Sequence, residues 1–177
     1  ATLVYTKGKG ELTSTVKDAD SDVLRQWMKD QEDNPEQAYE FNGLSTARLV
    51  LSASRAKVKR FIYLSTAHVY SNPLIGRVSE LTQPKNTHPY CTSHIVGENA
   101  VLNANKKGDI EGIVLRLSNA FGCPVSASIN CWMLLVNDLC QQIAKTQKLI
   151  LSSSGIQQRN FITLNNVSRV ISHFLTL

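Results

Sequence analysis

Short apolar runs alternate with segments of helical periodicity, and this alternation restricts the fold of the chain more than any other sequence feature. Residues 61–64, 113–115 and 149–151 are continuous apolar runs, which is typical of strands buried on both faces. Other apolar residues recur at the offsets of an amphipathic helix, in two sets: Trp132, Leu135, Val136, Leu139, Cys140 and Ile143, and Val167, Val170, Ile171, Phe174 and Leu175. Strands that alternate with helices predict βαβ units and an α/β fold with a parallel sheet.

Helices are also predicted ahead of the first apolar run. Asn34 and Pro35 form a typical helix start, since asparagine caps free backbone amides and proline loses no hydrogen bond at the first helical position. This pattern predicts a helix from Pro35 to about Phe41. The apolar spacing over residues 44–51 predicts a further helical segment that ends in a basic turn.

The composition is that of one globular domain. The chain has 177 residues, 42% of them apolar, and no internal repeats or linkers. Its longest apolar stretch, residues 131–136, is far below the roughly 20 residues that cross a bilayer, and its first residues lack a secretory signal, so we expect a cytoplasmic protein without a membrane partner. The cysteines lack zinc-ligand spacing, and the basic residues behind the net charge of +5 are scattered, so neither a metal site nor a nucleic-acid partner is expected.

Small polar residues follow the first two predicted strands. They occupy residues 65–68 and 118–122. In an open α/β sheet, ligands bind beyond the carboxyl ends of the strands, so we expect the functional site there.

A set of motifs around these positions resembles one family. The segment 61–70 (Phe-Ile-Tyr-Leu-Ser-Thr-Ala-His-Val-Tyr) is followed, 24 residues after Thr66, by Pro-Tyr-Cys-Thr-Ser-His at 89–94. Further matches lie at Asn42 and Thr46, at 116–122 and at 155–162. Together these resemble the extended short-chain dehydrogenase/reductase family, and specifically its NAD-dependent nucleotide-sugar epimerases and dehydratases.

The resemblance implies a Rossmann-like doubly wound parallel sheet, with residues 1–177 as one partial NAD(P)-binding domain and 123–177 contributing to the substrate-binding side. It also implies a homodimer, NAD or NADP as cofactor, and a nucleotide-activated sugar as substrate. The reaction would be an epimerisation, dehydration or reduction in which proton transfer by a tyrosine accompanies hydride transfer. The family pattern includes an N-terminal G-x-x-G-x-x-G turn that these residues lack, and it continues beyond Leu177, so we expect the chain to be part of a longer protein.

Three residues correspond to the catalytic positions of the family. A hydride leaves a carbon only as the attached hydroxyl loses its proton, so a base must lie near that hydroxyl and the nicotinamide. By the resemblance, Tyr90 is that base and Thr66 shares a hydrogen bond with the same oxygen. The family places a lysine four residues after the tyrosine, on the same helix face, where its charge lowers the tyrosine pKa; this chain has His94 there.

The change at position 94 leaves two interpretations open. A His94 protonated next to an anionic Tyr90 and the cofactor phosphates would give a slower or acid-shifted enzyme. Alternatively, the site is degenerate and the domain binds a nucleotide or sugar without turning it over, because histidine is mostly neutral at pH 7.

Further site residues follow from the resemblance. It implies cofactor contacts at Glu11, Leu12, Asn42, Ser65, Tyr90 and His94, and substrate contacts at Ala67, His68, Asn119 and Arg159. Three of these residues also have a purely structural interpretation: Asn42 as a helix-boundary residue, His68 as a packed loop residue, and Asn119 as a turn residue. Asn160 and Asn166 replace aspartates of the family pattern, which affects local pairing more than substrate class.

Overall fold

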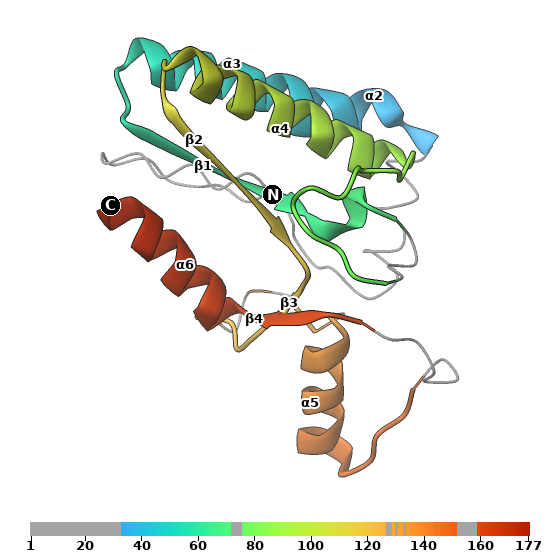
Figure 1. Cartoon of the computed structure of the whole chain (residues 1–177). Coiled ribbons are helices and arrows are strands. Elements are labelled where there is room, and N and C mark those ends of the chain that lie inside the picture. The colour runs from blue at the N-terminus through green and yellow to red at the C-terminus, as the bar shows by residue number, and fades with distance from the viewer. Residues whose placement is uncertain (1–32, 72–75, 127–128, 130, 133, 152–158) are drawn as a thin grey trace. The chain divides into compact units, whose positions relative to one another are not determined.

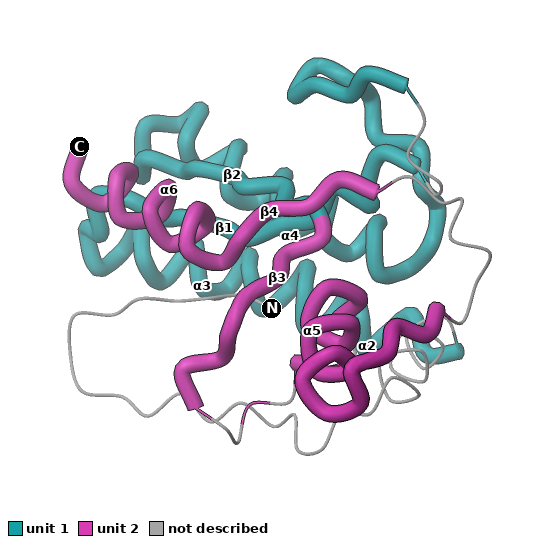
Figure 2. The backbone as a smooth tube through the Cα atoms, turned by 90° about the horizontal axis from the view of Figure 1, so that it is seen from below, with its two compact units in different colours: residues 1–7, 29–118 teal, residues 8–28, 119–177 magenta. Residues whose placement is uncertain are grey.

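A computed structural model of the chain describes residues 33–71, 76–126, 129, 131–132, 134–151 and 159–177 (Figure 1). These residues fall into two units: the first ends at Ser118, and the second begins at Asn119 (Figure 2). Within the described residues, no helix is both long and apolar enough to span a bilayer.

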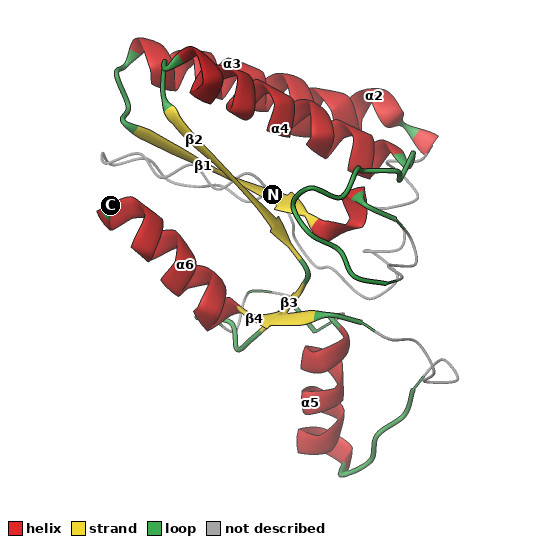
Figure 3. Cartoon of the chain, viewed as in Figure 1, coloured by secondary structure: helices red, strands yellow, loops and turns green. Residues whose placement is uncertain are grey.

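The first unit is a parallel strand pair covered by helices. Its elements in chain order are α2 (Pro35–Ala38), the π-helical η1 (Tyr39–Leu44), α3 (Ser45–Arg55), β1 (Arg60–Thr66), the 3-10 helix η2 (Ala67–Val69), α4 (Pro89–Lys107) and β2 (Glu111–Leu117). Strands β1 and β2 run parallel, with Tyr63 opposite Val114 and Thr66 opposite Leu117. Helices α3 and α4 lie on one face of this pair (Figure 3). The α/β prediction with parallel strands is therefore confirmed, and the runs at 61–64 and 113–115 are strands. The prediction that both faces of these strands are buried is wrong, because burial alternates along β1 and no residue of β2 is fully buried.

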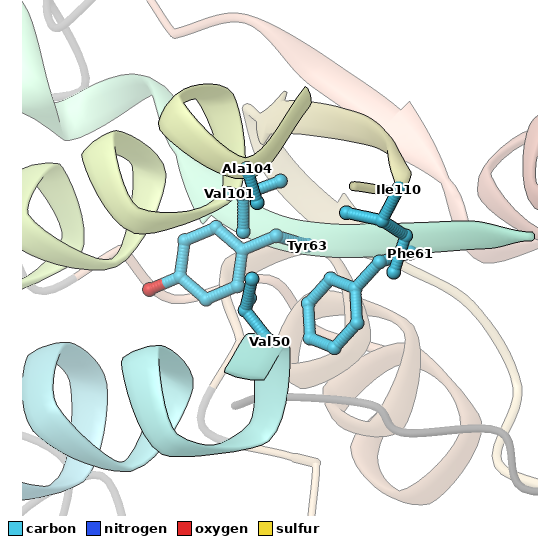
Figure 4. Packing of buried hydrophobic residues seen from close by; sticks show 6 residues of the cluster. All are labelled: Val50, Phe61, Tyr63, Val101, Ala104 and Ile110. Carbon is cyan, nitrogen blue, oxygen red and sulfur yellow. The ribbon is translucent and has the colours of Figure 1, made fainter. Parts of the chain in front are cut away.

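The core of the first unit lies between this helix layer and β1. Its buried members are Val50, Phe61, Tyr63, Val101, Ala104 and Ile110 (Figure 4). Burial of each large apolar side chain contributes roughly 1.5–3 kcal/mol, so this cluster fixes how α4 lies against β1. A second cluster joins η2 to the start of α4 through Val69, Tyr70 and Cys91.

The helix predicted from Pro35 is present and continues further than expected. Asn34 caps it, with its side chain accepting a hydrogen bond from the Gln37 amide at 3.4 Å. Helices α2, η1 and α3 follow one another without a break from Pro35 to Arg55. The wider π-helical turn between them carries Asn42, which is buried.

The second unit contains a shorter parallel pair, β3 (Asn119–Phe121) with β4 (Phe161–Thr163), and the helices α5 (Leu135–Thr146) and α6 (Leu164–Thr176). Both helices were predicted from their apolar spacing, although Trp132 lies in a turn ahead of α5. The prediction of a strand at 149–151 is wrong. The run is exposed, and no strand pairs with it among the described residues. The backbone amide of Ile150 donates instead to Oε1 of the Gln142 side chain at 2.8 Å.

Candidate active site

The first turn of α4 positions Tyr90. Helix α4 begins at Pro89, and Nδ1 of His88 accepts a hydrogen bond from the Tyr90 amide at 3.2 Å. Proline fits the first helical position because its missing N–H would have no partner there, and the His88 ring satisfies one of the free amides. The tyrosine side chain is half-buried against the Val69 cluster.

Thr66 lies at the carboxyl end of β1 and faces Tyr90. It is 6% exposed, and its Oγ1 accepts a hydrogen bond from the His68 amide at 3.2 Å, which starts the η2 turn. Burial raises the pKa of Tyr90 above its ordinary value, while a side-chain hydrogen bond with Thr66 opposes that rise. The structure thus brings together the two hydroxyls that the sequence predicts at a reacting oxygen.

His94 follows Tyr90 one turn along α4 and is only 2% exposed. Its ring meets the Tyr90 ring edge-on, with the centroids 4.7 Å apart and the planes at 76°. Its Nδ1 lies 3.0 Å from Oη of Tyr63, which comes from β1. Its Nε2 is buried and has no hydrogen-bond partner within the part of the chain that the structure describes.

The electrostatics of the site favour neutral side chains. Burial lowers the pKa of His94 to about 4, because an imidazolium loses its hydration there. The pKa of the Tyr90 phenol shifts the other way, also through burial. Both directions disfavour a protonated His94 beside an anionic Tyr90 in the chain without a ligand.

Asn42 ties the π-helical segment to α4 beneath the site. Its Nδ2 donates to Oγ of Ser93 at 3.0 Å, and its backbone carbonyl oxygen lies 3.3 Å from Oη of Tyr63. These contacts give Asn42 an ordering role in the first unit. A cofactor contact by this residue stays a prediction.

The other predicted site residues are distributed over the chain. Ala67 and His68 lie directly after Thr66 in η2, and the His68 carbonyl accepts from Nδ2 of Asn86 at 2.9 Å. Asn119 and the exposed Arg159 belong to the second unit, where the Asn119 side chain donates to the Asn160 carbonyl at 2.9 Å. The predictions for Glu11 and Leu12 fall outside the described residues.

Comparison with known proteins identifies the family. Residues 20–177 match the model of the NAD dependent epimerase/dehydratase family. The chain belongs to this family.

Individual relatives of this epimerase/dehydratase chain are distant. The human dTDP-D-glucose 4,6-dehydratase is 29% identical over 143 residues, which cover 79% of this chain and 39% of that protein. A UDP-glucose 4-epimerase from Rhizobium leguminosarum bv. trifolii is 27% identical over 99 residues, 56% of this chain and 30% of that protein. The chain therefore spans less than half the length of these relatives.

Solved structures show the same fold. A dTDP-glucose 4,6-dehydratase from Streptomyces venezuelae, with NAD and DAU bound, matches with a TM-score of 0.66 and 18% identity over 90% of this chain and 46% of that one. A UDP-glucuronic acid 4-epimerase from Bacillus cereus, in complex with UDP-glucuronic acid and NAD, matches with a TM-score of 0.62 and 24% identity. The match covers 77% of this chain and 41% of that one.

Two charged residues of this epimerase/dehydratase chain, the buried Glu98 and the partly buried Arg116, were missed by sequence reasoning. Glu98, one turn after His94, is 2% exposed and accepts from Nε of Arg116 at 2.9 Å and from Oγ of Ser65 at 2.5 Å. Arg116 also donates to Oη of Tyr70 at 2.8 Å. The network connects α4, β1, β2 and the segment after η2 behind the site, and places Ser65 in a structural contact.

Tyr63 was also missed, because it reads as a core residue of a buried strand. A glutamate at helical spacing from position 94 and an arginine at the end of the second strand were visible in the sequence. Their pairing was not, since it joins residues 18 positions apart through tertiary packing.

Proposed function

We propose that the protein containing this chain is an NAD(P)-dependent epimerase, dehydratase or reductase that acts on a nucleotide-activated sugar. The observation that carries the proposal is the approach of the Thr66 and Tyr90 hydroxyls, one at the end of β1 and the other in the first turn of α4. Membership of the epimerase/dehydratase family supports the reaction class, and the NAD bound in solved relatives supports the cofactor.

The residues present fit a dinucleotide on the nicotinamide side. His94 holds a buried nitrogen without a hydrogen-bond partner among the described residues, next to Tyr90. Buried polar atoms are ordinarily paired, so such an atom suits a ligand oxygen. In this proposal His94, Asn42 and Ser65 lie on the cofactor side, and Glu11 and Leu12 near the adenine.

When bound, the nicotinamide supplies the hydride that the reaction takes up or returns. The chain's own part is the proton. With its raised pKa, Tyr90 rests as a phenol, and it donates its proton to a sugar carbonyl oxygen as that carbon receives the hydride. In the opposite direction Tyr90 must first lose that proton. Thr66 hydrogen-bonds the same oxygen and holds it within reach of the phenol.

The remaining residues would hold the substrate. Ala67 and His68 follow Thr66 and would line the sugar pocket. Asn119 and Arg159 would contact the diphosphate, for which a guanidinium fork offers paired donors. A homodimer is part of the same proposal.

The test is turnover of nucleotide sugars with NAD or NADP by the full protein and its Tyr90→Phe variant. Loss of the proton donor is expected to lower kcat by roughly 100-fold or more. Tyr39→Phe is a matched control, because Tyr39 bonds the Thr92 hydroxyl on the outside of α4 and is 40% exposed. Equal turnover by wild type and Tyr90→Phe would contradict the proposal.

A second function is favoured by one observation. The neutral His94 supplies no charge to lower the pKa of Tyr90. A non-catalytic nucleotide- or sugar-binding protein would not need a tyrosine with a lowered pKa. In that case the wild type binds without turnover, and Tyr90→Phe keeps its affinity for the nucleotide sugar.

A further inference from the structure

Tyr63 and His94 form a buried pair at the centre of the first unit. Tyr63 is 0% exposed and His94 2% exposed, and their side chains come from β1 and α4. Among the described residues, the Tyr63 hydroxyl lies 3.0 Å from Nδ1 of His94 and 3.3 Å from the Asn42 carbonyl, and it also interacts with the side chain of Thr46. Such a pair decides which ring nitrogen of a neutral histidine carries the proton.

A glycine in α4 makes room for this pair. A Cβ atom at Gly97 would lie 2.6 Å from Oη of Tyr63 and 2.6 Å from the Asn42 carbonyl oxygen. Real Cβ atoms do not approach other atoms so closely, so any larger residue would displace the hydroxyl from His94. The geometry of the pair is therefore built into the helix.

Counting protons leaves two arrangements. A phenol has one proton to donate, and a neutral imidazole has one N–H and one acceptor nitrogen. If Tyr63 donates to Nδ1, the His94 proton lies on Nε2. If Tyr63 donates to the Asn42 carbonyl or to the Thr46 hydroxyl instead, Nδ1 must carry the proton and donate to Oη, and Nε2 is a bare acceptor.

The distances separate these arrangements. The 3.0 Å contact to Nδ1 lies nearer the usual hydrogen-bond length than the 3.3 Å contact to Asn42. We infer that Tyr63 is a positioning residue: its hydroxyl donates to Nδ1 of His94 and fixes the tautomer in which Nε2 bears the proton, so that His94 meets a ligand as a neutral hydrogen-bond donor.

The tautomer determines what His94 can bind. Its Nε2–H is buried beside Tyr90 and has no acceptor among the described residues. One directed N–H without charge suits a hydroxyl or other neutral oxygen of a ligand. The ligand contact of Nε2–H rests on the proposed function, in which the ligand oxygen belongs to the dinucleotide. The tautomer of His94 does not rest on the proposed function.

Nitrogen-15 NMR of the His94 ring tests the tautomer in the ligand-free full protein near pH 7. Two-bond proton–nitrogen correlations distinguish a protonated from a bare ring nitrogen. The expected result is a bare Nδ1 and a protonated Nε2, and a predominant Nδ1–H form would overturn the inference. The spectrum of the wild-type protein alone therefore tests the tautomer, and no variant is needed.

Tyr63→Phe removes only the hydroxyl, and the His94 nitrogen shifts are expected to move toward a mixture of tautomers. Tyr70→Phe is the matched control: this tyrosine is 7% exposed and bonds Arg116 instead. It is expected to leave the His94 tautomer unchanged. Unchanged His94 shifts in Tyr63→Phe would contradict the positioning role.

Addition of NADH then separates the two claims. A shift of the Nε2–H signal supports a ligand contact by His94. The predicted tautomer without any response to NADH or NADPH would keep the positioning role of Tyr63 and count against the proposed cofactor contact.

Discussion

At the scale of single residues, position 94 carries a buried histidine bonded to Tyr63, where the resemblance implies a lysine. Lysine at position 94 would favour a tyrosinate at Tyr90, whereas His94 is held neutral by burial and bonded by Tyr63. A neutral histidine leaves Tyr90 as a phenol, and in the proposed function this favours donation of a proton to a carbonyl oxygen. The burial of His94 also makes the stability of the protein depend on pH.

His94 is expected to make the protein less stable as the pH falls. The pKa of His94 in the folded state is about 4, below the ordinary value of 6.5. Between these values the unfolded chain binds a proton that the folded chain does not, so the free energy of unfolding decreases from about pH 6.5 down to pH 4. The loss is at most about 3 kcal/mol.

Urea unfolding followed by circular dichroism at pH 7 and pH 4.5 measures this loss. His94→Gln removes the titrating group and should flatten the pH dependence, whereas His173→Gln on the exposed side of α6 should leave it as in wild type. Equal pH dependence of wild type and His94→Gln would contradict a buried neutral histidine.

The sequence alone predicted Thr66, Tyr90 and His94 as a group, because their spacing matches a family pattern. It did not predict the state of His94. That state depends on Tyr63, which lies 31 residues away and is indistinguishable in sequence from an ordinary core residue.

At the scale of elements, the close approach of α4 to β1 and η1 organises the site. Gly97 is a point of close approach, since its missing side chain leaves space for Tyr63 and for the Asn42 carbonyl. The Glu98–Arg116 pair lies next to it, and breaking a buried ion pair on one side leaves an uncompensated charge. Helix α4 therefore carries both the reacting groups and the contacts that hold them.

Gly97→Ala is expected to destabilise the protein by about 1–3 kcal/mol, despite the higher helix propensity of alanine, because the added methyl displaces backbone and a buried ring. Thermal unfolding measures the change. Asn103→Ala on the exposed side of the same helix is the control and should change stability little. A stabilised Gly97→Ala protein would mean that α4 does not pack on β1 as described.

Several elements could be predicted from sequence, and the short strands of the second unit could not. Strands β1 and β2 and helices α3, α5 and α6 show apolar patterns, and α2 has a typical helix start at Asn34 and Pro35. Helix α4 has only a weak apolar pattern and was predicted from the family motif around Tyr90. Strands β3 and β4 have three residues each, too few for a pattern, and the run at 149–151 shows that apolar residues without a neighbouring strand do not form one. The π-helical turn at η1 has no recognised sequence signal.

At the scale of the whole molecule, the chain is a family member that spans only part of its relatives' length. Residues 20–177 match the family model, yet the human relative is covered to 39%. The complete doubly wound sheet that the resemblance implied stays a prediction, because the described residues contain two separate parallel pairs. Binding of a dinucleotide is accordingly a property to test on the full protein.

Calorimetric titration of NADH and NADPH into the full protein tests the central claim most directly. We expect one of the dinucleotides to bind, and His94→Leu to weaken that binding by roughly tenfold, the worth of about one buried hydrogen bond. Tyr39→Phe should bind as wild type does. Failure of the wild-type protein to bind either dinucleotide would contradict the account of this site as a cofactor site.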